Sequence, residues 1–429
     1  MKSVDYLIIG GSAAGTTAAE VVRSLVPEAS ITIITDEPYE EYSRVLLPFY
    51  IRKQSTREQL FLKKPQWYQE KKIELVKNTK AQDLEPKSHR VKVSSGEVYQ
   101  YGKLLIAIGG FPVELSVDGS ELENILYFRT VDDADEILKV AAEAKKAVII
   151  GGGFVSLDFA TGFYANGISD ITILVREPYY WAGKLDDVSS QVLTNVLLEN
   201  GVKIITGDEI EKFEPSFGEA SEGKVGAVLT RGGKTLECDV AAVGIGIRPD
   251  ILWLSGSAVK INRWILTNEY LETNLPDVYA AGDCAEFFDV IFNKQHALGN
   301  WANATSQGSV AAKNMVCAAT GGKVGARTIF ETASSYSDSF FGKSYTFIGV
   351  TDAKYADEVI SRGSVESGKM TRIFVKTIDN VLRIVGATVI NDPAEVGPLT
   401  SAVKGKTDIF PHIDKLGDLN FDLKKLLET

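Results

Sequence analysis

Cysteine is scarce in this chain. Its 429 residues include only Cys238, Cys284 and Cys317, and no two of them form a C-x-x-C motif. This scarcity argues against a disulfide scaffold, a structural zinc site and a local redox-active disulfide. The three histidines join no His/Cys/Asp cluster with the spacing of metal ligands, so we expect no metal site. A reducing, cytoplasmic location is expected.

The sequence also lacks long hydrophobic runs and an excess of positive charge. No run reaches the roughly 18 apolar residues of a membrane span, and the N-terminus has no secretory signal pattern. The formal net charge of −11 disfavours nucleic acid as a partner, because DNA binding depends largely on cationic patches. An apolar fraction of 45% and a charged fraction of 24% are typical of a soluble globular protein, and the length allows two or three domains.

Two glycine-rich turns are present. Gly10-Gly11-Ser12-Ala13-Ala14-Gly15 follows one strand-like apolar run, and Gly151-Gly152-Gly153-Phe154-Val155-Ser156 follows another. Each turn precedes a helix-competent stretch and a second apolar run, at 31–34 or 171–175. This context is typical of a dinucleotide-binding unit, in which a pyrophosphate meets the free N–H groups of a helix N-terminus and nearby side chains must be small. Two such units predict two bound dinucleotides with electron transfer between them.

Neither turn matches the G-x-G-x-x-G pattern fully. Ser12 holds the middle position of the first turn, between Gly10 and Gly15, and Ser156 holds the third position of the second turn. The third position packs the helix against the strand, so a small residue is acceptable there.

The order of these patterns predicts an α/β fold with two Rossmann-like dinucleotide-binding domains and a C-terminal α+β domain. The first domain is expected to be discontinuous, at 1–112 and 248–323, because the run at 277–283 and the small-residue helix at 302–319 return to it. The second domain, 113–247, repeats the layout of the first. From 324 to 429, alternating apolar runs predict an antiparallel sheet with a C-terminal helix.

The two turns, the Ala280-Ala281-Gly282-Asp283 segment and the C-terminal domain together resemble the FAD-dependent pyridine nucleotide oxidoreductases. The resemblance covers nearly the whole chain and implies FAD at the first turn and NADH or NADPH at the second. The first turn is similar to that of coenzyme A-disulfide reductases and NADH oxidases. Asp36-Glu37-Pro38, with Tyr42-Ser43-Arg44, is more similar to ferredoxin reductases, rubredoxin reductases and the flavin part of nitrite reductase.

The resemblance also implies which residues bind the cofactors. Asp36 or Glu37 matches the acid that binds a ribose, Arg44 matches a basic residue beside FAD, and Asp283 matches the acid that bonds the ribityl chain. Trp301, Ala304 and Gln307 match positions that approach the flavin ring. The complete predicted set is Gly10, Ser12, Ala13, Ala14, Gly15, Asp36, Glu37, Arg44, Ile108, Gly109, Gly151, Gly153, Phe154, Val155, Arg176, Gly246, Gly282, Asp283, Trp301, Ala304 and Gln307.

Two departures from the family pattern concern the reaction. Thiol-using members carry a redox cysteine where this chain has Val45, so reduction of coenzyme A disulfide by a thiolate is not expected. The ferredoxin-reductase branch pairs a lysine with a glutamate on the second helix, at positions that here are Phe49 and Asp158. We therefore expect Asp158 to lack its cation, to be partly desolvated and to have a raised pKa. Asp158 and Pro48 are the catalytic candidates.

The predicted reaction is hydride transfer from NAD(P)H to N5 of FAD, followed by electron transfer to a small carrier protein such as rubredoxin or ferredoxin. Alternatives are an NAD(P)H oxidase that reduces dioxygen, and a non-catalytic flavoprotein subunit of a larger reductase. Arg176 could accept the 2′-phosphate of NADPH, whereas Glu177 could repel it; NADPH or dual use is slightly favoured. The family implies a homodimer formed through the C-terminal domain.

Overall fold

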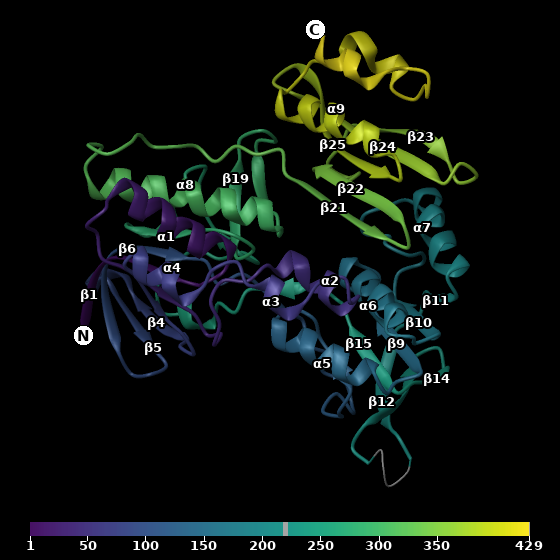
Figure 1. Cartoon of the computed structure of the whole chain (residues 1–429). Coiled ribbons are helices and arrows are strands. Elements are labelled where there is room, and N and C mark those ends of the chain that lie inside the picture. Colours follow the sequence, from purple (N-terminus) through teal and green to yellow (C-terminus); the bar gives the residue numbers. More distant parts are fainter. Residues whose placement is uncertain (218–221, 429) are drawn as a thin grey trace. The chain divides into compact units, whose positions relative to one another are not determined.

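The computed structural model describes residues 1–217 and 222–428 and divides into two compact units. Unit 1 comprises Met1–Val45, Thr56–Phe111 and Ile247–Thr332, and unit 2 comprises Leu46–Ser55, Pro112–Gly246 and Ala333–Thr429. Figure 1 shows the chain coloured along its sequence. The boundaries of the three predicted domains stay a prediction; residues 218–221 and 429, which fall within the second and third of them, lie outside the described residues.

Unit 1 is built on a seven-stranded sheet. Its strands are β1 (Lys2–Ile9), β2 (Ile31–Ile34), β3 (Ile73–Val76), β4 (Ala81–Glu85), β5 (Arg90–Val93), β6 (Val98–Ile106) and β18 (Val278–Ala280). The order is β3-β2-β1-β6-β5-β4, and β18 pairs with β6. The strands β1, β2, β3, β6 and β18 pair in parallel, whereas β5 pairs antiparallel with β4 and β6. The continuous apolar ends of β1 and β2 are typical of parallel strands that are buried on both faces.

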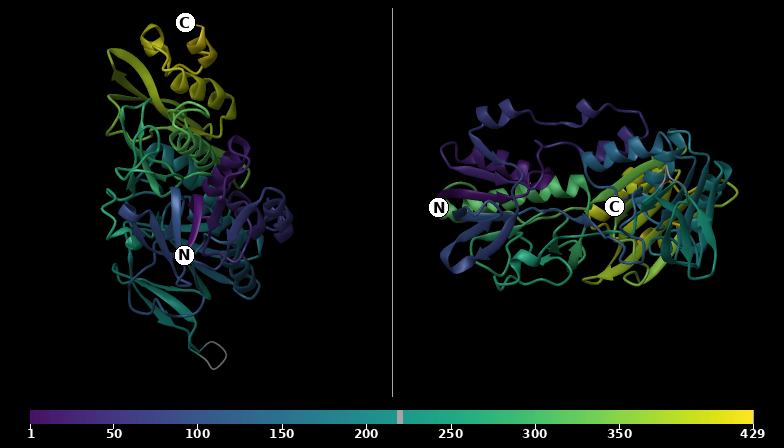
Figure 2. Two further views of the ribbon diagram at one scale, coloured as in Figure 1. Left: turned by 90° about the vertical axis from the view of Figure 1, so that its left-hand side faces the viewer. Right: turned by 90° about the horizontal axis from the view of Figure 1, so that it is seen from below.

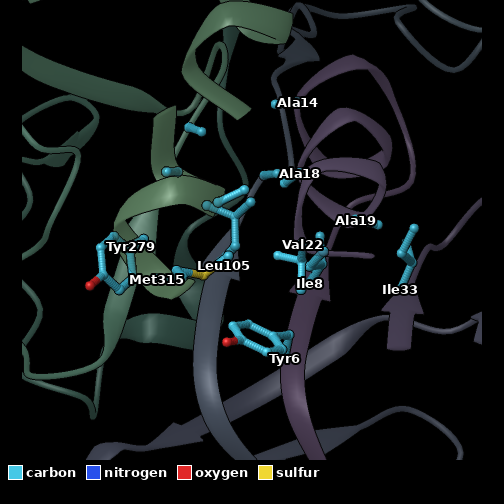
Figure 3. Packing of buried hydrophobic residues seen from close by; sticks show 14 of the residues in the cluster. Tyr6, Ile8, Ala14, Ala18, Ala19, Val22, Ile33, Leu105, Tyr279 and Met315 are labelled. Carbon is cyan, nitrogen blue, oxygen red and sulfur yellow. The ribbon is translucent and has the colours of Figure 1, made fainter. Parts of the chain in front are cut away.

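Two long helices, α1 (Ala13–Leu25) and α8 (Trp301–Ala319), lie side by side in unit 1 (Figures 1 and 2). A Cβ on Gly308 would lie only 2.1 Å from the carbonyl oxygen of Ala14, so glycine permits this close approach. Val22 of α1 and Met315 of α8 belong to one buried cluster with Ile8 and Leu105 of the sheet (Figure 3). The beginning of α1 is therefore held firmly between the sheet and α8.

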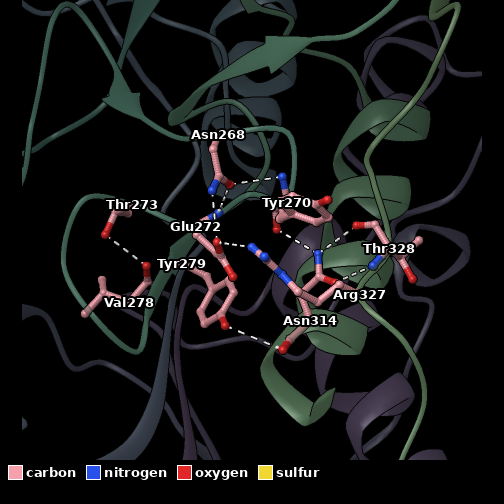
Figure 4. Close-up of polar contacts among 9 residues, drawn as sticks. All are labelled: Asn268, Tyr270, Glu272, Thr273, Val278, Tyr279, Asn314, Arg327 and Thr328. Carbon is pink, nitrogen blue, oxygen red and sulfur yellow. Dashed lines mark hydrogen bonds and ion pairs between the residues drawn. The ribbon is translucent and has the colours of Figure 1, made fainter. Parts of the chain in front are cut away.

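The chain after α8 is bonded back to that helix (Figure 4). Asn314 donates from Nδ2 to the carbonyl oxygens of Tyr270 and Thr328, each at 2.8 Å, and its Oδ1 accepts the N–H of Thr328 at 2.7 Å. The guanidinium of Arg327 lies 3.8 Å from the ring centroid of Tyr270 and pairs with Glu272. These contacts fix α8 relative to the loop that precedes β18.

The remaining elements of unit 1 are short. They are α3 (Arg57–Leu60), α4 (Pro65–Glu70), η2 (Pro86–Ser88), η4 (Leu252–Leu254), β17 (Ile265–Leu266), β19 (Ala285–Asp289) and β20 (Lys294–Ala297). The last three form a small sheet in the order β17-β19-β20. At the borders between the units lie η1 (Arg44–Leu46), β7 (Phe111–Pro112) and β16 (Ile247–Arg248).

Unit 2 contains a second parallel sheet. Its strands are β8 (Ile125–Leu126), β9 (Lys146–Ile150), β10 (Asp170–Val175), β11 (Val202–Thr206) and β15 (Val240–Val243), in the order β11-β10-β9-β15-β8. Around it are α2 (Leu47–Ile51), α5 (Val131–Ala141), α6 (Phe154–Ala165), α7 (Asp187–Glu199) and an antiparallel sheet of β12 (Ile210–Pro215), β13 (Val225–Thr230) and β14 (Thr235–Glu237). The succession β9, α6 and β10 repeats that of β1, α1 and β2, as the sequence predicted.

The C-terminal part of unit 2 is an antiparallel sheet with short helices. Its strands are β21 (Ser335–Phe340), β22 (Lys343–Gly349), β23 (Glu358–Ser364), β24 (Lys369–Ile378) and β25 (Val381–Ile390), followed by α9 (Pro393–Lys404), η5 (Phe410–Lys415) and η6 (Leu423–Leu427). The order is β21-β22-β25-β24-β23. Buried Arg362 pairs with Glu395 at 3.0 Å and donates to the carbonyl oxygens of Leu416 and Phe421, which fastens the final segment to the sheet. Among the described residues, no helix is long and apolar enough to cross a membrane.

Candidate cofactor sites

The first glycine turn joins β1 to α1 in unit 1. Gly10 has φ +117°, and a Cβ there would lie 2.1 Å from the carbonyl oxygen of Ala107; a Cβ on Gly15 would lie 1.9 Å from the carbonyl oxygen of Gly10. Both positions therefore require glycine. The N-cap residue Ser12 makes no side-chain capping hydrogen bond, and the first turn of α1 contains no acidic residue. This helix N-terminus thus offers N–H donors and a partial positive charge to an anion.

Residues distant in sequence meet beside this turn. A Cβ on Gly282 would be in tight contact with the methyl group of Ala14, at 3.3 Å, and in ordinary contact with that of Ala304, at 3.7 Å. The Oε1 of Gln307 accepts the N–H of Gly282 at 2.7 Å, while its Nε2 is buried and has no hydrogen-bond partner among the described residues. A buried amide N–H without a partner is costly, so this atom points to an acceptor supplied by a ligand.

The predicted acids and the arginine of unit 1 lie after β2. Burial, and then the charge of Glu37, raise the pKa of Asp36. Arg44 pairs with Glu37 and interacts electrostatically with Asp283. Arg44 thus links Glu37 and Asp283 by charge, and a shared role of the three residues in binding FAD stays a prediction.

The rest of the predicted FAD set borders this region. Ile108 and Gly109 follow β6, and the backbone nitrogen of Ile108 would lie 3.1 Å from a Cβ on Gly10. Ala13 is buried at the start of α1, whereas Trp301 is half-buried at the start of α8.

The second glycine turn joins β9 to α6 in unit 2 with similar geometry. Gly151 has φ +121°, and a Cβ there would lie 2.3 Å from the carbonyl oxygen of Gly244. The N-cap residue Gly153 has no side chain to cap α6. Ser156 is fully buried, and its Oγ has no hydrogen-bond partner among the described residues. Serine thus replaces the third glycine as a packing residue, as the sequence predicted.

The remaining predicted nucleotide residues surround this turn. The Cβ of Val155 would lie 3.2 Å from a Cβ on Gly244, and Gly246 follows β15 with open space around it. Arg176 directly follows β10, has a side chain that is 72% exposed and pairs with Glu177 at 3.1 Å. Arg176 is therefore accessible at the end of the second strand, where a 2′-phosphate would be recognised.

An aromatic cluster, which sequence reasoning missed, covers the second turn. The Trp181 ring meets that of Phe154 edge-to-face at 4.7 Å, and Tyr336 of β21 meets Phe154 at 4.3 Å. Tyr345 and Phe347 of β22 complete the cluster, at 5.2 and 5.3 Å from Trp181. Trp181 has φ +62°, a rare conformation for a bulky residue. Aromatic side chains therefore surround the start of α6.

The expectation that Asp158 lacks a cation is wrong. Arg52, directly after α2, donates from Nη2 to Oδ1 of Asp158 at 2.8 Å and from Nε to Oγ1 of Thr161 at 2.9 Å. Both charged side chains are more than 90% buried. Arg52 lies three residues beyond Phe49, about one helical turn. Matching each position of this chain to the same position of the family pattern therefore does not identify Arg52 as the cation.

The predicted rise in the pKa of Asp158 is confirmed. Burial raises the pKa to about 8; the neighbouring charge of Asp338 adds to the rise and Arg52 opposes it. The other catalytic candidate, Pro48, lies within the first turn of α2. A carboxyl group with a pKa near neutrality can gain or lose a proton under working conditions.

The cysteine thiols are not suited to act as redox nucleophiles. Residue 45, which the family resemblance matches to a redox cysteine, is a valine. Cys284 is fully buried, donates to the carbonyl oxygens of Ile106 and Ala281, and has a pKa raised to about 12 by burial. Such a thiol is not a nucleophile at neutral pH.

Two glycine turns of this geometry, each opening a helix beside a parallel sheet, define a protein that binds two dinucleotides. Residues 4–308 match the family described as pyridine nucleotide-disulphide oxidoreductase. The chain belongs to this family, which confirms the fold class, the enzyme class and the expected cofactors, FAD with NADH or NADPH. The glycine cradle and the buried Nε2 of Gln307 in unit 1 fit FAD, and the second turn with Arg176 fits a nicotinamide dinucleotide.

Individual proteins show similar sequences or structures. The chain is 26% identical over 420 residues to nitrite reductase [NAD(P)H] of Bacillus subtilis, covering 95% of this chain and 48% of that one. It is 26% identical over 413 residues to the NADH-dependent phenylglyoxylate dehydrogenase subunit epsilon of Aromatoleum evansii, covering 96% and 94%. Its structure resembles NADH:rubredoxin oxidoreductase from Clostridium acetobutylicum, with 25% identity, a TM-score of 0.73 and full coverage of both chains. The chain thus spans about half of the Bacillus relative.

Proposed function

We propose that this protein takes electrons from NADH or NADPH through FAD and delivers them to a small electron-carrier protein such as a rubredoxin or a ferredoxin. The observation that carries the proposal is the state of the thiols. Val45 replaces the redox cysteine, and Cys284 is buried with a pKa of about 12. Without a thiolate relay at that position, the flavin would pass its electrons directly to the acceptor.

The residues of this chain supply binding and orientation. We assign the pyrophosphate of FAD to the N-terminus of α1, with Gly282 and Gln307 beside it, and the nicotinamide dinucleotide to the N-terminus of α6. When bound, FAD accepts two electrons from NAD(P)H and can release them singly. Asp158 and Pro48 remain the proposed catalytic residues.

The similarity to NADH:rubredoxin oxidoreductase extends over both whole chains and supports a carrier protein as acceptor. A second candidate has support of its own. The Aromatoleum relative is a subunit of a dehydrogenase, and the match covers 94% of that subunit. The chain could therefore serve as the flavin subunit of a larger enzyme, in which a partner subunit takes the place of the carrier.

Anaerobic reduction tests the proposal. The purified protein should bind FAD, and its flavin absorbance should bleach with NADH or NADPH and recover when an oxidised rubredoxin or ferredoxin is added. Recovery only with dioxygen, together with peroxide release, would indicate an oxidase. A stoichiometric companion that co-purifies from the native source and accepts the electrons would favour the subunit. A flavin that stays oxidised with both nucleotides would contradict all three.

We also propose a cytoplasmic location and a homodimer formed through the C-terminal sheet. The location is supported by three cysteines that are all buried and free. The dimer is implied by the family resemblance, and sedimentation of the purified protein would test it.

A further inference from the structure

The buried pair of Arg52 and Asp158 belongs to a larger cluster in unit 2, in which the described residues 1–217 and 222–428 supply one carboxylate more than they supply cations. Tyr336 donates to Oδ2 of Asp338 at 3.3 Å. The ring of Tyr336 packs on Phe154, which lies four residues before Asp158 on α6 and therefore on the same face of the helix. The Tyr336–Asp338 pair thus approaches the face that carries Asp158, and Asp158 and Asp338 interact electrostatically.

One guanidinium cannot neutralise two neighbouring carboxylates, of which Asp158 is buried and Asp338 is half-buried. Because two close carboxylates disfavour each other's ionisation, a proton on Asp158 relieves the repulsion. The surrounding hydroxyl groups can share hydrogen bonds but carry no positive charge. The titratable and charged groups around Asp158 are Arg52 after α2, Tyr336 and Asp338 of β21, Tyr345 of β22 and Tyr180 of the loop before α7.

The same helix begins at the second glycine turn. Phe154 is the first residue of α6, so Asp158 lies about 6 Å further along the helix axis, at 1.5 Å per residue. A pyrophosphate at the helix N-terminus would place negative charge within roughly 8 Å of Asp158. At an effective dielectric constant of about 20, charges at this separation change an equilibrium constant roughly tenfold, after screening by salt.

We propose that Asp158, held between Arg52 and the Tyr336–Asp338 pair, carries a proton whose uptake is coupled to binding of the dinucleotide at the glycine turn that starts the same helix. This inference rests on the proposed function. An anionic dinucleotide favours the neutral form of Asp158, so binding takes up a proton. Conversely, as the pH rises and Asp158 becomes negative, repulsion weakens binding.

The test measures the affinity of the complete FAD-loaded protein for ADP-ribose, which keeps the pyrophosphate of NAD⁺, lacks the positively charged nicotinamide ring, does not reduce the flavin and has no titrating 2′-phosphate. Isothermal titration is carried out from pH 6.5 to 9.5, in pairs of buffers with different ionisation enthalpies, to obtain both Kd and the number of protons taken up. For the natural sequence we expect Kd to be flat at low pH and to rise roughly tenfold above pH 8, with a fraction of a proton taken up near pH 8.

Three variants separate the outcomes. Asp158→Asn should bind ADP-ribose without pH dependence in this range. Asp338→Asn, which leaves the Arg52–Asp158 pair intact, should shift the rise in Kd to lower pH and keeps the test valid if Asp158→Asn does not fold. Asp170→Asn, at an exposed site on β10 that pairs with Lys203, is the matched control and should behave like the natural sequence.

Binding whose pH dependence is the same in Asp158→Asn, Asp338→Asn and the natural sequence would overturn the inference and leave the proposed function intact. If neither NAD⁺ nor NADP⁺ binds at any pH, the proposed function itself fails, and the inference with it.

Discussion

Replacing Gly10 by alanine should remove FAD from the protein. The residue has φ +117°, a conformation that costs other residues about 1–3 kcal/mol. A methyl group would also lie 2.1 Å from the carbonyl oxygen of Ala107. This overlap is with backbone rather than with a flexible side chain, so β6 or the turn must move, at a further cost of about 1–3 kcal/mol. The total, about 2–6 kcal/mol, is large against a typical folding free energy of about 5–15 kcal/mol.

Gly11→Ala is the matched control for stability. The neighbouring residue has no positive φ, and its Cβ would lie 3.2 Å from the side chain of Thr35, which needs a shift of only a few tenths of an ångström. We expect Gly11→Ala to lower the free energy of unfolding by less than about 1.5 kcal/mol. Both variants differ from the natural sequence by one methyl group at adjacent positions.

The assay has two readouts. Urea unfolding of the apoproteins, followed by circular dichroism, measures the cost to the fold without the cofactor, and the ratio of flavin to protein absorbance after purification measures retention of FAD. Gly10→Ala should unfold at clearly lower urea than Gly11→Ala and should purify without flavin. Equal stability of the two apoproteins, or full flavin content in Gly10→Ala, would refute the argument from the turn geometry.

Three further predictions concern single side chains. Gln307→Leu should weaken FAD binding about 5- to 100-fold, which is the value of one buried hydrogen bond to an acceptor on the cofactor. Reconstitution of the apoprotein with FAD measures the affinity, and Gln295→Leu is the control. Unchanged affinity would show that Nε2 of Gln307 has no partner on the cofactor. Thiol reagents should leave the native protein unmodified, because all three cysteines are buried. Cys284→Ala should keep its NAD(P)H-dependent flavin reduction. Loss of that reduction in a folded, flavin-loaded variant would show that the thiol of Cys284 takes part in the reaction. Arg176→Gln should raise the Kd for NADPH about tenfold while changing the Kd for NADH less than twofold. The reason is that a charge-assisted hydrogen bond to phosphate contributes about 1.5–3 kcal/mol, a value that is smaller for an exposed side chain such as this one. Equal changes for the two nucleotides would show that Arg176 does not recognise the 2′-phosphate.

The parts of this protein that sequence reasoning predicted are those whose causes are local. An apolar run followed by glycines predicts a buried strand that ends in a tight turn, and both β1 and β9 end in this way. The stretch of small residues at 302–319 predicts a helix that returns to the first domain, and α8 (Trp301–Ala319) lies in unit 1; its close approach to α1 at Gly308 was not predicted. An isolated glycine inside a helix usually has a packing reason, so Gly308 could have been included in the predicted site.

What sequence reasoning missed depends on contacts between distant residues. Arg52 and Asp158 are separated by 106 positions, and their pairing follows from the packing of α2 on α6. A comparison with the family pattern located the cation at Phe49 because it assumed an unchanged position. The structure shows that a cation one turn later reaches the acid, since arginine is longer than lysine and aspartate is shorter than glutamate. Likewise, no local pattern connects Trp181 with β22.

The two glycine turns share a backbone geometry but have different walls, and the difference bears on how each cofactor is used. Around the first turn the walls are backbone and small residues: Ala14 of α1, Gly308 of α8 and Gly282, which follows β18, offer no side chain that can rotate. A ligand enclosed there leaves only if whole elements separate, which suits a cofactor that stays bound. Around the second turn the walls are instead the packed aromatic rings of Phe154 and Trp181. The permanently bound cofactor and the exchanged dinucleotide are therefore assigned to surroundings of different chemistry, close-packed backbone in one case and aromatic side chains in the other.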